Sequence, residues 1–308
     1  MAEVSAALVK QLRDKTGAGM MNCKAALVET AGDLEGAEDW LRKKGLSSAA
    51  KKADRVAAEG LICVGTQGPK GALVELNSET DFVARNELFC ALAQWLGEAA
   101  VAVDGDLAAL KQAVYPETNR SVEDEITHLI ATVGENMNLR RSTALAVDRG
   151  VVAGYAHAAA APGVGRIGVL VALESPGDAD KLLEFGKKLA MHVAAARPEA
   201  VTVGDLDPAL VARERNVLTE QAKASGKPDN VVEKMVEGRL KKFYQDAVLL
   251  EQIFVVDGES KVFAVVEAQA AEVGGPIKVA GFERYVLGEG IKKNEGDFAA
   301  EVAAQLDT

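Results

Sequence analysis

The sequence ELNSETDFVARNE at residues 75–87 carries the chain from a strand-like pattern into a helical one. Its apolar start predicts a buried strand, and residues 87–103 space their apolar side chains as one face of a helix. Asp81 is the expected N-cap of that helix. Two interpretations of Phe82 follow from the local pattern. Its ring points outward at the first helical turn, or it packs in the core with Phe89, seven residues later on the same face.

The sequence on either side of this turn predicts a mixed core. Two apolar runs, 61–64 and 72–76, are separated by a Gly-rich stretch that is typical of a β-hairpin. Further elements are expected downstream: a helix over 121–133 with Ser121 and Asp124 as a capping box, strands at 139–148, 151–157 and 166–173, and a helix over 178–195. Residues 246–287 return to apolar runs, in which 260–273 fits either a helix or a strand.

Three further segments are expected to flank or interrupt this core. The first is an N-terminal helical module, 1–58, whose first helix carries Val4, Leu8 and Leu12 and whose other helices cover 20–31, 34–44 (ending at Gly45) and 47–58. The second is a projecting antiparallel pair of helices, 207–245, which begins at Asp207 and Pro208 and breaks at Gly226-Lys227-Pro228. The third is a C-terminal module, 288–308, with a short helix that carries Phe298, Val302 and Leu306.

The predicted division of the chain is therefore as follows. Residues 59–145 form the first half of an α+β core and carry the turn Thr80-Asp81-Phe82-Val83, and residues 146–206 with 246–287 form the second half. The helical pair 207–245 is inserted in that second half.

Composition excludes several classes of protein. The 308 residues carry a net charge of −11, so a surface that wraps a nucleic acid is not expected. The three cysteines are scattered without a C-x-x-C pair, which argues against a disulfide framework and a structural zinc site and suits a reducing compartment. The N-terminus does not have the pattern of a signal peptide. The longest apolar stretch, 151–173, is interrupted by His157, Pro162 and Arg166 and predicts two strands rather than a membrane span. We expect a soluble cytoplasmic protein.

No catalytic pattern emerges from the residue types. The string Gly163-Val164-Gly165-Arg166-Ile167-Gly168 matches the dinucleotide fingerprint G-x-G-x-x-G, but a strand-like run follows it where the fingerprint requires a helix. We therefore interpret it as a flexible turn. The three histidines, at 128, 157 and 192, fall on separate predicted elements. The expectation is a protein without an active site, a metal site or a cofactor.

Several motifs, in order along the chain, resemble the bacterial translation elongation factor Ts family. They are LRDKTGAGMMNCKAAL at 12–27, ELNSETDFVAR at 75–85, GENMNLRR at 134–141, RIGVLV at 166–171, MHVAA at 191–195 and KMVEGR at 234–239. Together they span nearly the whole chain. The stretch 158–165 is longer than the turn that the family pattern leads us to expect, and 253–278 fits that pattern loosely.

The resemblance implies a fold and a function. It implies a helical bundle like ubiquitin-associated (UBA) domains at 1–58, a two-part core with antiparallel sheets, an inserted antiparallel coiled-coil hairpin and a short C-terminal helix. It also implies a non-enzymatic guanine nucleotide exchange factor that binds the GDP-bound GTPase elongation factor Tu, dislodges Mg²⁺ and promotes GDP release.

In that role Thr80, Asp81, Phe82 and Val83 would form the wedge, and the weight of the ordered motifs favours the outward Phe82. Further contacts would come from Met20, Met21, His192, Phe298 and Val302. We expect neither a nucleic acid nor a membrane among the partners, and a homodimer or 2:2 complex through the core or hairpin is an open alternative. Two other functions compete: a scaffold that recruits a ubiquitin-like protein or RNA, and a dinucleotide enzyme that uses Gly163 to Gly168.

Overall fold

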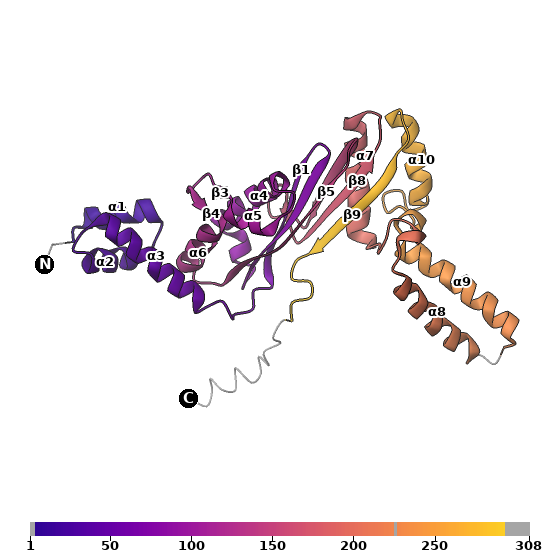
Figure 1. Ribbon diagram of the computed structural model, residues 1–308, viewed down its shortest axis with the longest axis horizontal. Helices are drawn as coiled ribbons and strands as arrows, with labels where there is room; N and C mark the ends of the chain where they lie inside the picture. Colours follow the sequence, from indigo (N-terminus) through magenta and orange to yellow (C-terminus); the bar gives the residue numbers. More distant parts are fainter. Residues whose placement is uncertain (1–3, 225–226, 293–308) are drawn as a thin grey trace.

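Two antiparallel sheets packed face to face form the centre of the molecule (Figure 1). The computed structural model describes residues 4–224 and 227–292. The first sheet has the order β5 (Met137–Ala146), β2 (Lys70–Ser78), β1 (Glu59–Gln67), β7 (Val164–Gly165). The second has the order β6 (Gly150–His157), β8 (Ile167–Glu174), β9 (Lys278–Val286). The strands confirm the expected α+β class.

The two faces of β1 and β2 explain why these strands are apolar almost throughout. Residues such as Leu61 and Cys63 pack toward the helices, whereas Ile62 packs toward the second sheet. Both faces are therefore buried, and the strands lack the alternation of polar and apolar residues that a half-exposed sheet shows. Leu170 of β8 completes the layer between the two sheets.

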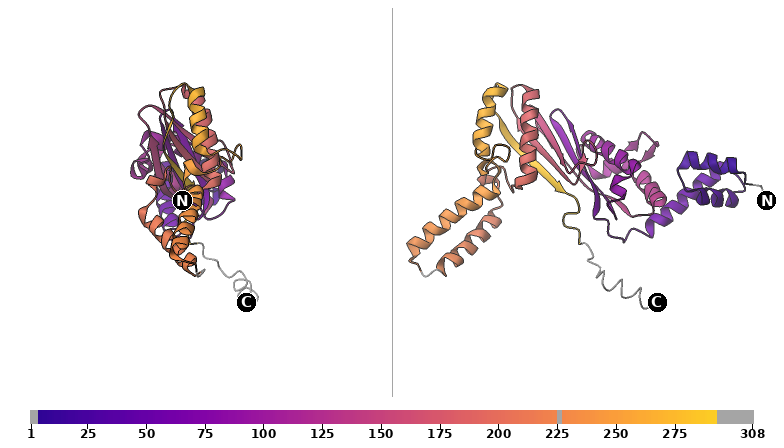
Figure 2. Two further views of the ribbon diagram at one scale, coloured as in Figure 1. Left: turned by 90° about the vertical axis from the view of Figure 1, so that its right-hand side faces the viewer. Right: turned by 180° about the vertical axis from the view of Figure 1, so that it is seen from behind.

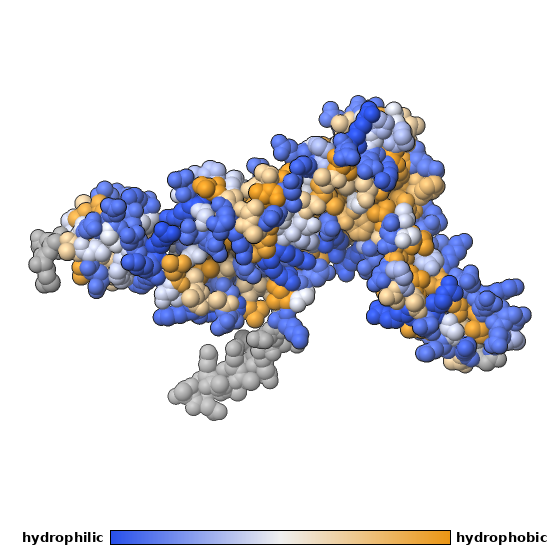
Figure 3. Space-filling model, in the orientation of Figure 1, coloured by the Kyte–Doolittle hydropathy of each residue, from blue (hydrophilic) through white to orange (hydrophobic). Residues whose placement is uncertain are grey.

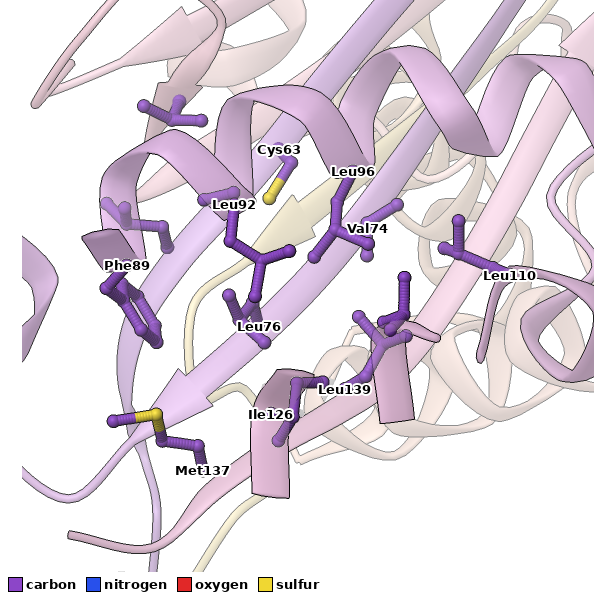
Figure 4. Packing of buried hydrophobic residues seen from close by; sticks show 14 of the residues in the cluster. Cys63, Val74, Leu76, Phe89, Leu92, Leu96, Leu110, Ile126, Met137 and Leu139 are labelled. Atoms are coloured by element: carbon purple, nitrogen blue, oxygen red, sulfur yellow. The ribbon is translucent and has the colours of Figure 1, made fainter. Parts of the chain in front are cut away.

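Helices cover the outer faces of both sheets. Against the first sheet lie α4 (Glu87–Ala102), α5 (Leu107–Gln112) and α6 (Val122–Val133), and Figure 4 shows Phe89, Leu92 and Leu96 of α4 pointing at the strands. Ser121 caps α6 by accepting a hydrogen bond from the Asp124 backbone N–H at 3.1 Å. Against the second sheet lie α7 (Ala179–Ala196) and α10 (Val262–Val273), so the ambiguous stretch 260–273 is mainly helical. The short helix α5 and the two-residue strands β3 (Val114–Tyr115) and β4 (Arg120–Ser121) are additions that the sequence pattern did not predict.

The N-terminal segment differs from the prediction at its third helix. After α1 (Ala6–Thr16) and α2 (Met20–Glu29), a single helix α3 (Leu34–Ala50) continues through Gly45, so the predicted end at Gly45 and the separate helix over 47–58 are wrong. A glycine within a helix costs about 1 kcal/mol relative to alanine. Here Gly45 is buried, and an added Cβ would lie 3.4 Å from the Cβ of Ala131 on α6. The close packing of α3 on α6 offsets that cost.

A pair of helices projects from the opposite end of the molecule (Figure 2). Helices α8 (Pro208–Lys223) and α9 (Asp229–Ala247) run side by side and share an apolar cluster made of Leu218, Ala222, Val232, Val236 and Leu240. On the face shown in Figure 3, apolar residues gather over β9 and α10, whereas the far end of the pair is mostly hydrophilic. That this pair forms a coiled coil, and that residues 1–58 resemble a UBA domain, stay predictions.

The glycine string at 163–168 contributes to two strands, one in each sheet, and it is not the flexible turn we expected. It spans β7 and the start of β8, and an added Cβ at Gly168 would overlap the Ile62 side chain of the first sheet. Small residues here allow the two sheets to approach each other. Over the residues that the structure describes, no helix is long and apolar enough to cross a membrane. The predicted C-terminal helix with Phe298 and Val302 lies outside the described residues.

Candidate functional site

Residues 79–85, here called the Phe82 corner, connect β2 to α4. A 3₁₀ turn covers Val83–Arg85, and α4 starts at Glu87 with Asn86 as its cap. The Asn86 side chain accepts hydrogen bonds from the backbone N–H groups of Leu88 at 3.0 Å and Phe89 at 3.3 Å. The predicted cap, Asp81, is therefore wrong.

The start of α4 at Glu87 decides the orientation of Phe82. Because Phe82 lies before the helix, it does not share a face with Phe89, which is fully buried under α4. Phe82 is 77% exposed. The alternative in which both rings pack in the core is wrong, and the outward interpretation matches the structure.

Charge-assisted hydrogen bonds hold the base of the corner to the loop after α6. The Glu135 carboxylate accepts from the Thr80 backbone N–H at 3.0 Å and from the Thr80 hydroxyl at 2.7 Å. In return, the Glu79 carboxylate accepts from the Asn136 backbone N–H at 2.5 Å. Such bonds are roughly twice as strong as neutral ones. With Val83 buried beneath the turn, the exposed ring stands on a rigid support.

Asp81 lies beside the ring and remains available to a partner. Its carboxylate forms an ion pair with Arg85 one turn later, at 3.2 Å, and both side chains are substantially exposed to solvent. Exposed pairs of this kind contribute at most about 1 kcal/mol. A partner that offers a cation or a hydrogen-bond donor can therefore compete for Asp81 at little cost.

The other predicted contact residues fall in different environments. Met20 and Met21, at the start of α2, are 59% and 77% exposed. They are suited to contact a partner. Phe298 and Val302 lie outside the described residues.

His192 is fully buried on α7 and has no surface to offer a partner. The Gln252 amide nitrogen donates to backbone carbonyl oxygens at 3.3 and 2.7 Å, so its oxygen accepts the hydrogen bond from Nε2 of His192 at 2.8 Å. Nδ1 of His192 accepts from the Val255 backbone N–H at 3.2 Å. Burial lowers the pKa of His192, against the opposing effect of the Gln252 hydrogen bond. We therefore remove His192 from the set of direct contacts.

The structure also reveals an exposed apolar group that the sequence pattern did not single out. Ile253, Val255 and Val256 are each about half exposed. They lie in the loop whose Val255 backbone N–H donates to His192. Four consecutive apolar residues, 253–256, were the available signal, but the same pattern also fits a buried strand.

No group of three or more His, Cys, Asp or Glu side chains is arranged to hold a metal ion within the described residues. The Phe82 corner offers an aromatic ring, a carboxylate and a stiff backbone. This arrangement is suited to protein–protein contact.

Comparison with known proteins places the chain in a family. The family model described as "Elongation factor TS" matches residues 79–289, which include the whole Phe82 corner. The chain belongs to the elongation factor Ts family. Proteins named elongation factor Ts are 60% identical in Rhodospirillum rubrum, over 307 residues that cover 99% of each chain, and 58% identical in Rhodospirillum centenum, over 304 residues and 99% of each. The Gluconobacter oxydans protein is 56% identical over 308 residues, the full length of both chains. Membership of the elongation factor Ts family assigns the chain a role in translation elongation.

Proposed function

We propose that this chain is a guanine nucleotide exchange factor for the GTPase elongation factor Tu, and that it acts through contact without chemistry of its own. The observation that carries the proposal is Phe82, which is 77% exposed on a corner whose base is held by hydrogen bonds between Thr80 and Glu135. Exposure of a large aromatic side chain to water is unfavourable in the free protein. An aromatic side chain held on a rigid turn is typical of binding sites.

The physical mechanism follows from how GTPases hold GDP. Phosphate contacts and a bridging Mg²⁺ supply much of the affinity, so release requires that these contacts weaken. Phe82 enters an apolar slot of the GTPase domain and shifts the segments that hold the metal, while Asp81 acts near the metal. Thr80 and Val83 anchor the turn. Coupling is reciprocal, so the factor that weakens GDP binding is itself expelled when GTP binds.

The remaining contact surfaces complete the proposal. Met20 and Met21 bind the GTPase domain together with the C-terminal module, 288–308, in which Phe298 and Val302 contribute contacts. We keep the five-part division into 1–58, 59–145, 146–206 with 246–287, 207–245 and 288–308, and we place the protein in the cytoplasm. A 2:2 complex through the core or hairpin stays a prediction, which light scattering of the purified complex tests.

The experiment mixes the full-length chain with elongation factor Tu loaded with fluorescent GDP, in the presence of Mg²⁺ and excess GTP. The release rate should rise with the concentration of the chain and reach a plateau. Chelation of Mg²⁺ without the chain should also accelerate release, because both treatments remove the metal contribution. A release rate that stays at its intrinsic value at every concentration of the chain would refute the proposed function.

A further inference from the structure

A buried carboxylate lies near the end of β2, seven residues before Phe82. Glu75 has no exposed surface, and charged groups in that position require partners. Its carboxylate accepts hydrogen bonds from Arg140 at 3.0 and 3.1 Å, from Arg141 at 2.5 Å and from the Asn77 amide at 3.0 Å. It also accepts from the backbone N–H of Gly288 at 2.8 Å, 213 positions away in the sequence.

The two arginines also form hydrogen bonds to the end of β9 and to the segment that follows it. Arg140 donates to the Glu289 carbonyl oxygen at 2.7 Å, and Arg141 donates to the Val286 carbonyl oxygen at 3.1 Å. Residues 286–289 are therefore held through backbone atoms by one buried ionic network. These residues lead from the second sheet to the C-terminal part of the chain.

The same place also fixes the connection from the N-terminal helices. Gly288 has a φ of +72°, and an added Cβ there would overlap the carbonyl oxygen of Ala58, so the two backbones touch. The Asn77 amide, which binds Glu75, also donates to the Glu59 carbonyl oxygen at 3.2 Å. Ala58 is the last residue of the connection from α3 to β1, and Glu59 is the first residue of β1. Three segments thus meet at Glu75: the N-terminal connection, the C-terminal connection and the strand that runs into the Phe82 corner.

The energetics favour a geometric role for this network. Replacing a buried ionic network by well-packed apolar residues is often neutral or stabilising, so stability alone does not account for its charges. Burial alone would raise the pKa of Glu75, but hydrogen bonds from Gly288, Asn77 and Arg141, together with the charge of Arg141, hold the pKa below its ordinary value. The carboxylate is therefore ionised at neutral pH.

We infer that Glu75 is a positioning residue, which holds residues 286–289 and the connection at 58–59 in a fixed place relative to Phe82. The inference rests on the proposed function. A partner that contacts the N-terminal helices, the corner and the C-terminal part together gains affinity when these parts are already arranged, because less ordering is required on binding. Release of the C-terminal connection lowers that affinity and leaves the action of Phe82 on the bound GTPase intact.

The test compares Glu75→Gln with the full-length wild-type chain in the fluorescent-GDP assay. The concentration that gives half-maximal release should rise five- to tenfold, and the plateau rate should stay within twofold. The matched control is Glu174→Gln, which removes an exposed ion pair with Lys278 near the other end of β9. That control should change neither quantity.

Backbone hydrogen exchange supplies the readout that a general structural role would not produce. In Glu75→Gln, exchange at residues 286–289 should accelerate at least tenfold, while exchange in β8, in α4 and in the part of β1 after Glu59 keeps its wild-type rate. Uniform acceleration across both sheets, or an unchanged half-maximal concentration in a folded variant, overturns the inference. If Glu75→Gln does not fold, Arg140→Lys removes the bond to Glu289 and is measured in the same way.

The exchange measurement also separates the two proposals. If the wild-type chain fails to accelerate GDP release, the proposed function fails. Localised exchange in the variant would still support the role of Glu75 in holding the three segments together.

Discussion

Replacement of Phe82 by alanine is the sharpest test of the corner. Full burial of a phenylalanine side chain is worth about 1.5–3 kcal/mol. Since 77% of Phe82 is exposed in the free chain, its insertion into a partner supplies roughly three quarters of that, about 1.2–2.3 kcal/mol. One factor of ten in rate corresponds to about 1.4 kcal/mol, so stimulated GDP release should slow by about 7- to 50-fold.

The assay measures release of fluorescent GDP from elongation factor Tu at a fixed, sub-saturating concentration of the chain. The variant should keep its fold, because the side chain has few contacts to lose. Its free energy of unfolding in urea should stay within about 0.5 kcal/mol of wild type. Phe263→Ala is the matched control, since Phe263 is another exposed phenylalanine, 51% accessible on α10. Release by folded Phe82→Ala at the wild-type rate, or an equal loss in Phe263→Ala, would refute the reasoning.

Three further perturbations test the supporting structure. Glu135→Gln replaces the charged acceptor of both Thr80 hydrogen bonds, each worth about 1.5–3 kcal/mol, so stimulated GDP release should fall at least fivefold while circular dichroism stays unchanged. Gly168→Ala forces a methyl group between the sheets and should lower the free energy of unfolding in urea by about 1–3 kcal/mol, and a shift below 0.5 kcal/mol would contradict the packing argument. Because the pKa of His192 is lowered in the folded chain, this histidine is protonated in the unfolded chain at a higher pH than in the folded chain. Stability should therefore drop below about pH 6.5, by up to about 1.4 kcal/mol per pH unit until the folded pKa is reached, and His192→Asn should remove this part of the pH dependence.

The sequence predicted the corner's location but not its internal geometry. The change from an apolar run to a helical pattern is local, and it located the junction between β2 and α4 correctly. The choice between Asp81 and Asn86 as the helix cap is not local, because both residue types cap helices well. In the structure, Thr80 is bonded to Glu135, 55 positions later, and a 3₁₀ turn precedes Asn86, so Phe82 lies outside the helix.

Long-range contacts also account for the other differences. Gly45 is a helix terminator by local preference, but its packing against Ala131 of α6 keeps α3 continuous. His192 carries a polar side chain in a family motif, yet it is buried because Gln252, 60 positions later, supplies its partner. Neither partner is identifiable from a single sequence, since the pattern of one element does not reveal which distant residue packs against it.

The strength of the hydrogen bonds at the base of the Phe82 corner, relative to the free energy of Phe82 insertion, determines whether the corner or the GTPase deforms on binding. Insertion of Phe82 supplies about 1.2–2.3 kcal/mol. The three charge-assisted hydrogen bonds at the base of the corner, two to Glu135 and one to Glu79, each contribute about 1.5–3 kcal/mol. Rotation of the corner away from the partner would break these hydrogen bonds, and the free energy lost would exceed the free energy gained by insertion of Phe82. In the proposed exchange reaction, the corner therefore keeps its shape, and the free energy of insertion is available to displace the GTPase segments that hold Mg²⁺.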